Sequence, residues 1–223
     1  MAVQSRSRHA RHDDPRERGG ESKRVGGGPL WREIAPSRKL QDTEFESGSA
    51  EGRHRGLAIH RMLQLATQTQ GPELNAGDIL SRVATESGLT PDTALLQQCW
   101  DEVSKLLENR ALSWLFTPLS GTRTFNEVPI QYRRGQQTVY GIIDRLVVTD
   151  TDIHLIDYKT HRIDSASLAQ QLAEHYKPQL ELYREGVRRL WPDHPVRAYL
   201  LLTDGGKLVN IDNPSSGPVG ATD

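Results

Sequence analysis

Two aspartates and a lysine interrupt an apolar stretch, GIIDRLVVTDTDIHLIDYKT, at residues 141–160. The stretch is typical of a two-stranded hairpin. With a turn at residues 150–151, Asp144 stands directly opposite Asp157, with Cβ atoms about 4.5–5.5 Å apart. Side chains alternate along a strand, so Lys159 is expected on the same face as Asp157. The rest of that face is predicted to be apolar: Ile142, Leu146, Val148, Ile153 and Leu155.

Two like charges that face each other destabilise a sheet, and their burial adds a desolvation cost. Three arrangements offset that cost: a proton shared between the acids, the charge of Lys159, or a divalent cation held by carboxylate oxygens. A cation would polarise a phosphoryl oxygen and lower the pKa of a bound water, while Lys159 would orient the water or stabilise developing charge. An ordinary ion pair between Lys159 and one acid fits the spacing equally well. The pairing that sets the two acids opposite each other assumes a turn at Asp-Thr, which is a weak hairpin turn.

Helices and further strands must position these groups. The spacing in RGLAIHRMLQLA, residues 55–66, predicts one helix, and a second is predicted over 91–116 with Thr90 as its N-cap. A helix over about 165–190 is expected to break near 175–177 and to restart at Pro178, because proline lacks the N–H that a helix interior needs. Strands are predicted at 125–133, 137–149, 152–159, 196–203 and 207–211. This order predicts an α/β (α+β) fold with a mixed sheet flanked by helices.

Composition limits the class of protein. The chain has 223 residues and a formal net charge of −1, so any nucleic-acid-binding surface must be local. Its single cysteine, Cys99, excludes an internal disulfide framework and a cysteine-ligated zinc or iron–sulfur site within the chain. No stretch approaches the roughly 18 apolar residues of a membrane span, and we expect a cytoplasmic protein without membrane contact. The expected organisation is a largely disordered tail at 1–50, one domain at 51–212 and a frayed tail at 213–223.

An acid, a turn and then Asp-x-Lys form the signature of the PD-(D/E)xK nuclease superfamily. Over about residues 31–211 the chain resembles one branch of it, the nuclease domain of RecB/AddA-type (exonuclease V-like) helicase–nucleases. The segments that carry the resemblance are APSRKL, GLAIHRML with His60, NEVPI with Glu127, GIIDRLV with Asp144, IDYKT with Asp157 and Lys159, and YKPQLELY with Tyr176, Gln179 and Tyr183.

The resemblance implies a restriction-endonuclease-like core and hydrolysis of DNA phosphodiesters with Mg²⁺ or Mn²⁺. The implied metal ligands are His60, Asp144, Asp157 and the backbone carbonyl of Tyr158, and the implied catalytic residues are Asp144, Asp157, Lys159, Gln179 and Tyr183. Contacts to DNA or to the metal ligands are expected from Glu127, Arg55, Arg61 and Tyr176. Read without the resemblance, His60 is an ordinary packed histidine, Glu127 a solvated glutamate at a strand edge, and Arg55 and Arg61 part of a solvated helix face.

The function predicted from these motifs is a metal-dependent DNA nuclease of exonuclease type that favours single-stranded ends and acts in DNA repair or recombination. The chain lacks a Gly-x-x-x-x-Gly-Lys-Ser/Thr loop and so has no ATP site of that kind. If a motor is needed, a separate helicase or repair-complex subunit must supply it. Two alternatives stay open: a non-catalytic DNA-end or partner-binding module that keeps the fold, and a hydrolase of some other phosphodiester.

Overall fold

The computed structural model describes residues 32–34 and 49–214, apart from residues 70, 118 and 164. The predicted tails and the APSRKL segment lie largely outside the described residues. The elements are β1 (Arg32–Ile34), α2 (Ala50–Ala66), α3 (Ala76–Ser87), α4 (Ala94–Glu108), the 3-10 turn η1 (Arg110–Leu112), α5 (Ser113–Phe116), β2 (Arg123–Arg134), β3 (Gln137–Val148), β4 (Ile153–Lys159), α6 (Ala166–Leu190), β5 (Val196–Leu202) and β6 (Lys207–Asn210).

The described strands form one mixed sheet in the order β1-β3-β4-β5-β6, with β2 paired to β3. β1 runs parallel to β3, and β4 runs parallel to β5, with α6 as the crossover between them. The other pairs, β2–β3, β3–β4 and β5–β6, are antiparallel. The predicted mixed sheet flanked by helices is confirmed. No helix in the described part of the chain is long and apolar enough to span a membrane.

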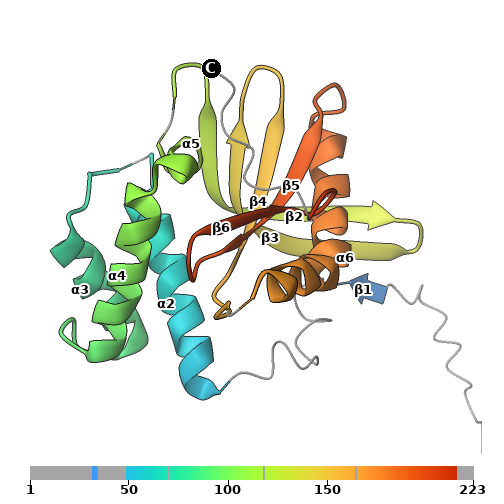
Figure 1. Cartoon of the computed structure of the whole chain (residues 1–223). Helices are drawn as coiled ribbons and strands as arrows, with labels where there is room; N and C mark the ends of the chain where they lie inside the picture. Colours follow the sequence, from blue (N-terminus) through green and yellow to red (C-terminus); the bar gives the residue numbers. More distant parts are fainter. Residues whose placement is uncertain (1–31, 35–48, 70, 118, 164, 215–223) are drawn as a thin grey trace, which may run out of the picture. The chain divides into compact units, whose positions relative to one another are not determined.

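Two apolar layers cover the two faces of the sheet. Helices α2 to α5 bury one face, where they meet Val147, Ile156 and Leu201. The long helix α6 buries the opposite face, against neighbours of those residues such as Leu146 and Leu155. Figure 1 shows α2, α3 and α4 grouped away from α6. Alternate residues of each central strand thus enter different cores, as expected for a sheet covered on both sides.

Helix α6 does not break before Pro178, contrary to the prediction. It continues for 25 residues with the proline inside it. An internal proline removes one helical hydrogen bond at a cost of about 3 kcal/mol. Apolar burial on both sides of the proline offsets that cost, because Leu172 and Tyr176 before it and Leu180 and Val187 after it all pack into the same core.

Two other helix predictions need correction. The helix predicted over 91–116 ends at Glu108, because Asn109 takes an extended backbone and its side chain accepts a hydrogen bond from Ala111 N–H, which starts a separate short turn. Its N-cap is Thr93, not Thr90. Helix α3 was not predicted at all, although its start carries a capping box.

Candidate active site

Strands β3 and β4 separate at the two aspartates. They pair in the predicted register over four residue pairs, the last of which is Arg145 opposite Ile156. The same register would next place Asp144 opposite Asp157, but the ladder stops before them. The Asp144 carboxylate instead accepts a hydrogen bond from the backbone N–H of Tyr158, with 2.6 Å between Oδ2 and N. The acids therefore stand at a fork between two strands.

Strict alternation of side chains fails at this fork. Ile143 and Leu146 both pack against α6. The residues between them, Asp144 and Arg145, both turn toward α2, where Asp144 meets a histidine and Arg145 meets the helix C-cap. The expectation that Ile142 belongs to the apolar face with Leu146 is therefore wrong, and Arg145 does not point away from Asp144 as strict alternation would require. Ile142 is exposed.

Strand β2 changes phase at the same level. The Asn126 side chain donates to a backbone carbonyl of α2, whereas Val128 packs against α6. Between them, Glu127 has a φ of 52°. It is the only non-glycine residue of the described chain with a positive φ. Such a backbone is unfavourable for a residue with a Cβ atom. Because both strands shift phase together, their pairing register is preserved on either side. The strain turns two carboxylates, Glu127 and Asp144, toward α2.

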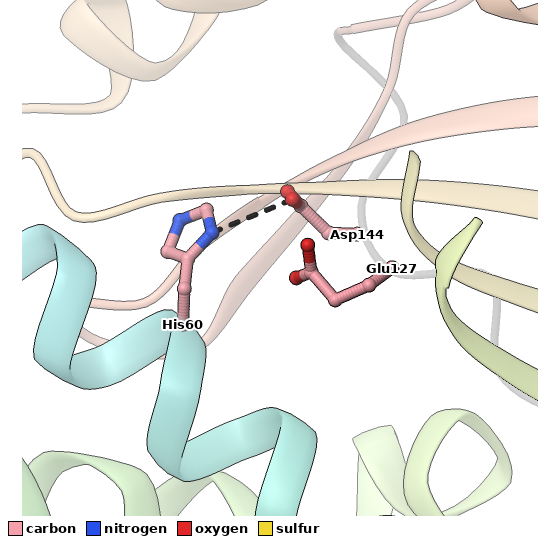
Figure 2. Close-up of side chains that lie close together, drawn as sticks. All are labelled: His60, Glu127 and Asp144. Atoms are coloured by element: carbon pink, nitrogen blue, oxygen red, sulfur yellow. Dashed lines mark ion pairs between the residues drawn. The ribbon is translucent and has the colours of Figure 1, made fainter. Parts of the chain in front are cut away.

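A group of potential metal ligands results. His60 from α2, Glu127 from β2 and Asp144 from β3 offer ligand atoms that all lie within 4.8 Å of one another (Figure 2). His60 Nδ1 lies 3.4 Å from Asp144 Oδ1. The other ring nitrogen, Nε2, lies 3.1 Å from the carbonyl oxygen of Tyr158. A carbonyl only accepts, so Nε2 carries a hydrogen and Nδ1 is the atom that faces the acids.

The charges of this group depend on one another. Burial opposes protonation of His60, but the adjacent Asp144 carboxylate outweighs it and raises the pKa of the imidazole. Burial likewise opposes ionisation of Asp144, and the His60 charge and hydrogen bond outweigh it, so the pKa of that carboxyl is lowered. Burial and the nearby Asp144 charge raise the pKa of Glu127. Without a cation, the negative charge thus favours a proton on His60 and opposes ionisation of Glu127.

The second aspartate belongs to a different set of contacts, on the α6 side. Asp157 is 3% exposed, and its Oδ1 accepts a hydrogen bond from Gln179 Nε2 at 3.2 Å. Its Oδ2 lies 3.2 Å from Lys159 Nζ, an ion-pair contact, and has no further hydrogen-bond partner among the described residues. Burial raises the pKa of Asp157 to about 6, against the opposing effect of Lys159. Lys159 Nζ also lies 4.2 Å from the centre of the Tyr176 ring, a cation–π contact.

Helix α6 fixes this set through one helical turn. Gln179 Nε2 also lies 3.1 Å from the hydroxyl oxygen of Tyr183, four residues along the helix. The Tyr183 ring packs on the backbone of β3 at Gly141, where an added Cβ would lie 2.4 Å from Tyr183 Cε1. Gly141 is therefore required for close approach, and it ties the position of Gln179 to that of β3.

Two arginines anchor α2 and hence His60. Arg55 donates to the carbonyl of Thr160, just beyond β4, at 2.7 Å and pairs with Glu102 of α4. Arg61 binds Glu86 of α3 through two hydrogen bonds of 2.8 and 2.7 Å. Both guanidinium groups are thus engaged within the protein. Contact of either arginine with DNA stays a prediction.

The structure thus gathers the predicted residues into two groups at the fork. The α2-side group is His60, Glu127, Asp144 and the Tyr158 carbonyl, and the α6-side group is Asp157, Lys159, Tyr176, Gln179 and Tyr183. Glu127 stands among potential metal ligands, closer to the chemistry than its sequence context indicated. Nothing in the residue type of Glu127 predicts its positive φ. The sequence signal for its role was the NEVPI segment. Such a set of carboxylates, an imidazole and an ammonium can bind a divalent cation and stabilise negative charge on a phosphate.

Comparison with known families gives a match over most of the chain. The model of the PD-(D/E)XK nuclease superfamily matches residues 34–217, a range that contains every element from α2 to β6.

Individual relatives come from large bacterial proteins. The chain is 26% identical over 187 residues to a Lactococcus lactis protein named as an ATP-dependent helicase/nuclease subunit, and the match covers 81% of the chain and 15% of the relative. The protein of the same name from Anoxybacillus flavithermus is 34% identical over 170 residues, covering 71% of the chain and 13% of the relative. The exonuclease/helicase protein RexA of Lactococcus lactis is 25% identical over 187 residues, with 81% and 15% covered. The chain therefore matches only a small part of these relatives.

Proposed function

Because the chain belongs to the PD-(D/E)XK nuclease superfamily, we propose that it is a divalent-metal-dependent deoxyribonuclease that hydrolyses phosphodiester bonds in DNA repair or recombination. The observation that carries this proposal is the convergence of acids, histidine and lysine from separate elements where β3 and β4 part. A binding module would have no use for the backbone strain at Glu127 or for the buried carboxylate of Asp157.

The residues present fit a divalent cation. Asp157 keeps a buried carboxylate oxygen without a hydrogen-bond partner among the described residues, and the ligand atoms of His60, Glu127 and Asp144 lie close together. We propose Mg²⁺ or Mn²⁺ held by His60, Asp144, Asp157 and the Tyr158 carbonyl, with Glu127 as a further ligand. A bound cation supplies a Lewis acid for a phosphoryl oxygen and lowers the pKa of a water molecule.

The chain's own residues complete the chemistry. Lys159 Nζ, next to Asp157, orients the attacking water or stabilises the charge that develops on the phosphate. Tyr176 beneath the ammonium and Asp157 beside it hold Lys159 in place. Gln179 holds one oxygen of Asp157, so that the other can face a cation. His60 would hold a metal through Nδ1 only in its neutral form, since ligand nitrogens must be deprotonated.

The relatives are named for helicase and nuclease activities. On that ground we propose that the chain acts on strands that a helicase unwinds, whether the motor is a separate repair-complex subunit or not. Exonuclease action, a preference for single-stranded ends and a cytoplasmic location belong to the same proposal.

End-labelled single- and double-stranded oligonucleotides, incubated with Mg²⁺ or Mn²⁺, test the proposal. Wild-type protein should shorten them, whereas Asp157→Ala and Lys159→Ala should not, with circular dichroism unchanged. Asp152→Asn is the matched control, because Asp152 lies on the same hairpin but pairs with Arg197 away from the fork. Wild-type protein that binds DNA without cutting it at any metal concentration would instead support the non-catalytic binding module.

A further inference from the structure

The outer part of the β2–β3 hairpin, residues 128–143, has a face beside the acids that no described helix covers. One side of this hairpin packs on α6 through residues such as Ile130 and Ile143. The other side is exposed and consists of Pro129, Gln131, Arg133, Tyr140 and Ile142, which we call the arm face. Tyr140 is 42% exposed and Ile142 41%. Figure 1 shows this part of β2 and β3 extending sideways from the other strands.

The arm face leads directly to the active site. Gln131 pairs with Tyr140 and Pro129 pairs with Ile142. In the same register the next position on this face holds Glu127 and Asp144, the carboxylates turned toward His60. Successive residues on one face of a strand are about 7 Å apart. A ligand that lies on Tyr140 and Ile142 therefore reaches the acids within two steps along the strands.

The charge of the arm suits a polyanion. Residues 128–143 contain Arg133 and Arg134 and no aspartate or glutamate, although the whole chain has 29 acidic residues. Arg134 pairs with Glu185 on the α6 side. Arg133 belongs to the arm face and lies at its far end from the acids. A phosphate chain thus meets positive charge first, and meets carboxylates only where a divalent cation can compensate them.

We propose that the arm face is the track along which a single polynucleotide strand approaches the fork, a proposal that rests on the function proposed above. Tyr140 stacks on a base, Ile142 contacts the next base or sugar, and Arg133 contacts a phosphate. Exposed aromatic rings recognise unpaired bases, whose faces are hidden in a duplex, and such stacking is tolerant of sequence. The occupant is therefore a single strand with little sequence preference.

The test measures binding of a fluorescein-labelled oligo(dT) by anisotropy in Mg²⁺, with the full chain carrying Lys159→Ala to prevent cutting. Adding Tyr140→Ala should weaken binding about tenfold, and Tyr140→Phe should not, because stacking needs only the ring. Arg133→Gln should reduce the slope of log Kd against log salt by roughly 0.7, the value for one phosphate contact on a single strand. Leu190→Ala, also an exposed apolar residue but at the end of α6, is the matched control and should leave binding unchanged.

Equal affinity of the Tyr140→Ala and Leu190→Ala proteins would overturn the track, and the arm face would then be free for a protein partner. Cutting of the oligonucleotide by chains without the Lys159 change separates the two proposals, and Leu190→Ala is again the control that should cut at the wild-type rate. Oligonucleotide cutting by wild type together with Tyr140-independent binding would reject the track and keep the nuclease. Tyr140-dependent binding without any cutting would keep the track and reject the nuclease.

Discussion

Asp144 and Arg145 are consecutive on β3 and both turn toward α2, yet they enter polar networks of opposite character. The guanidinium of Arg145 is fully buried and donates to neutral acceptors: Thr67 Oγ1 at 2.8 Å, Asn126 Oδ1 at 2.6 Å and backbone carbonyls of Leu115 and Phe116. Asp144 faces titratable groups instead, above all His60 and Glu127.

The difference separates a structural site from a functional one. The arginine network joins α2, α5 and β3 through hydrogen bonds whose acceptors do not change with pH. The acid network sets the carboxylates of Glu127, Asp144 and Asp157 against Lys159 and a titratable His60, so its charge balance depends on protons or a cation. The first network should therefore contribute to stability, and the second should reduce stability until a cation binds.

The largest expected effect is that of Asp157→Asn. Activity on end-labelled DNA should fall by about a thousandfold, as when a group that stabilises transition-state charge is removed. Stability of the metal-free protein should not fall, and should rise by about 1–2 kcal/mol because a buried carboxylate is replaced by a neutral isostere. Urea unfolding in EDTA measures the second part. A clear loss of stability would show that Asp157 is a structural residue like Arg145.

Arg145→Met should have the reverse profile. Unfolding free energy should fall by about 3 kcal/mol, because the acceptors around the guanidinium lose their donor while buried. Activity per folded molecule, with the folded fraction measured by circular dichroism, should remain near the wild-type value. Arg197→Met is the control, since Arg197 is 51% exposed and its pair with Asp152 should contribute under about 1 kcal/mol. Strong inactivation of folded Arg145→Met would show that the arginine network is needed for activity as well as for stability.

The two networks should also differ in pH dependence. The pKa of Asp157 is raised to about 6 in the folded protein, so the unfolded chain loses this proton first as pH rises. Metal-free wild type should therefore lose stability between about pH 4 and pH 7, by roughly 1–2 kcal/mol relative to Asp157→Asn. The raised pKa of His60 acts in the same direction, because its contribution is present at low pH and lost as pH rises. Urea midpoints across this range provide the measurement, and parallel curves for the two proteins would contradict it.

A smaller effect is expected from Gly141→Ala. The new methyl group would overlap the Tyr183 ring and displace it, and Gln179 with it, so activity should fall about tenfold and stability by about 1–3 kcal/mol. Gly52→Ala, in helix α2, where the nearest atom is 3.6 Å from the new Cβ, should leave activity unchanged and should not lower stability. Full activity of Gly141→Ala would show that the Gln179–Tyr183 contact does not position Asp157.

Sequence reasoning located the hairpin register because apolar residues on both strands and a short turn leave one pairing that buries them. It placed Lys159 beside Asp157, since two residues on one strand share a face. It could not place Arg145 or Ile142, because the change of phase depends on the strained backbone of Glu127 on the neighbouring strand. The low helix preference of proline gave the wrong prediction of a break before Pro178. Tertiary packing on both sides of the proline sustains the helix there.

The most direct test of a cation-dependent hydrolytic centre at the fork is the initial rate of label release from a single-stranded oligonucleotide as Mn²⁺ is raised from zero. Wild-type protein should show no release in EDTA and a saturable rise with Mn²⁺, and the Asp144→Asn protein should stay at background throughout. Release in EDTA at the rate seen with Mn²⁺, or an unchanged metal response in Asp144→Asn, would contradict the assignment of this acid network as the catalytic centre.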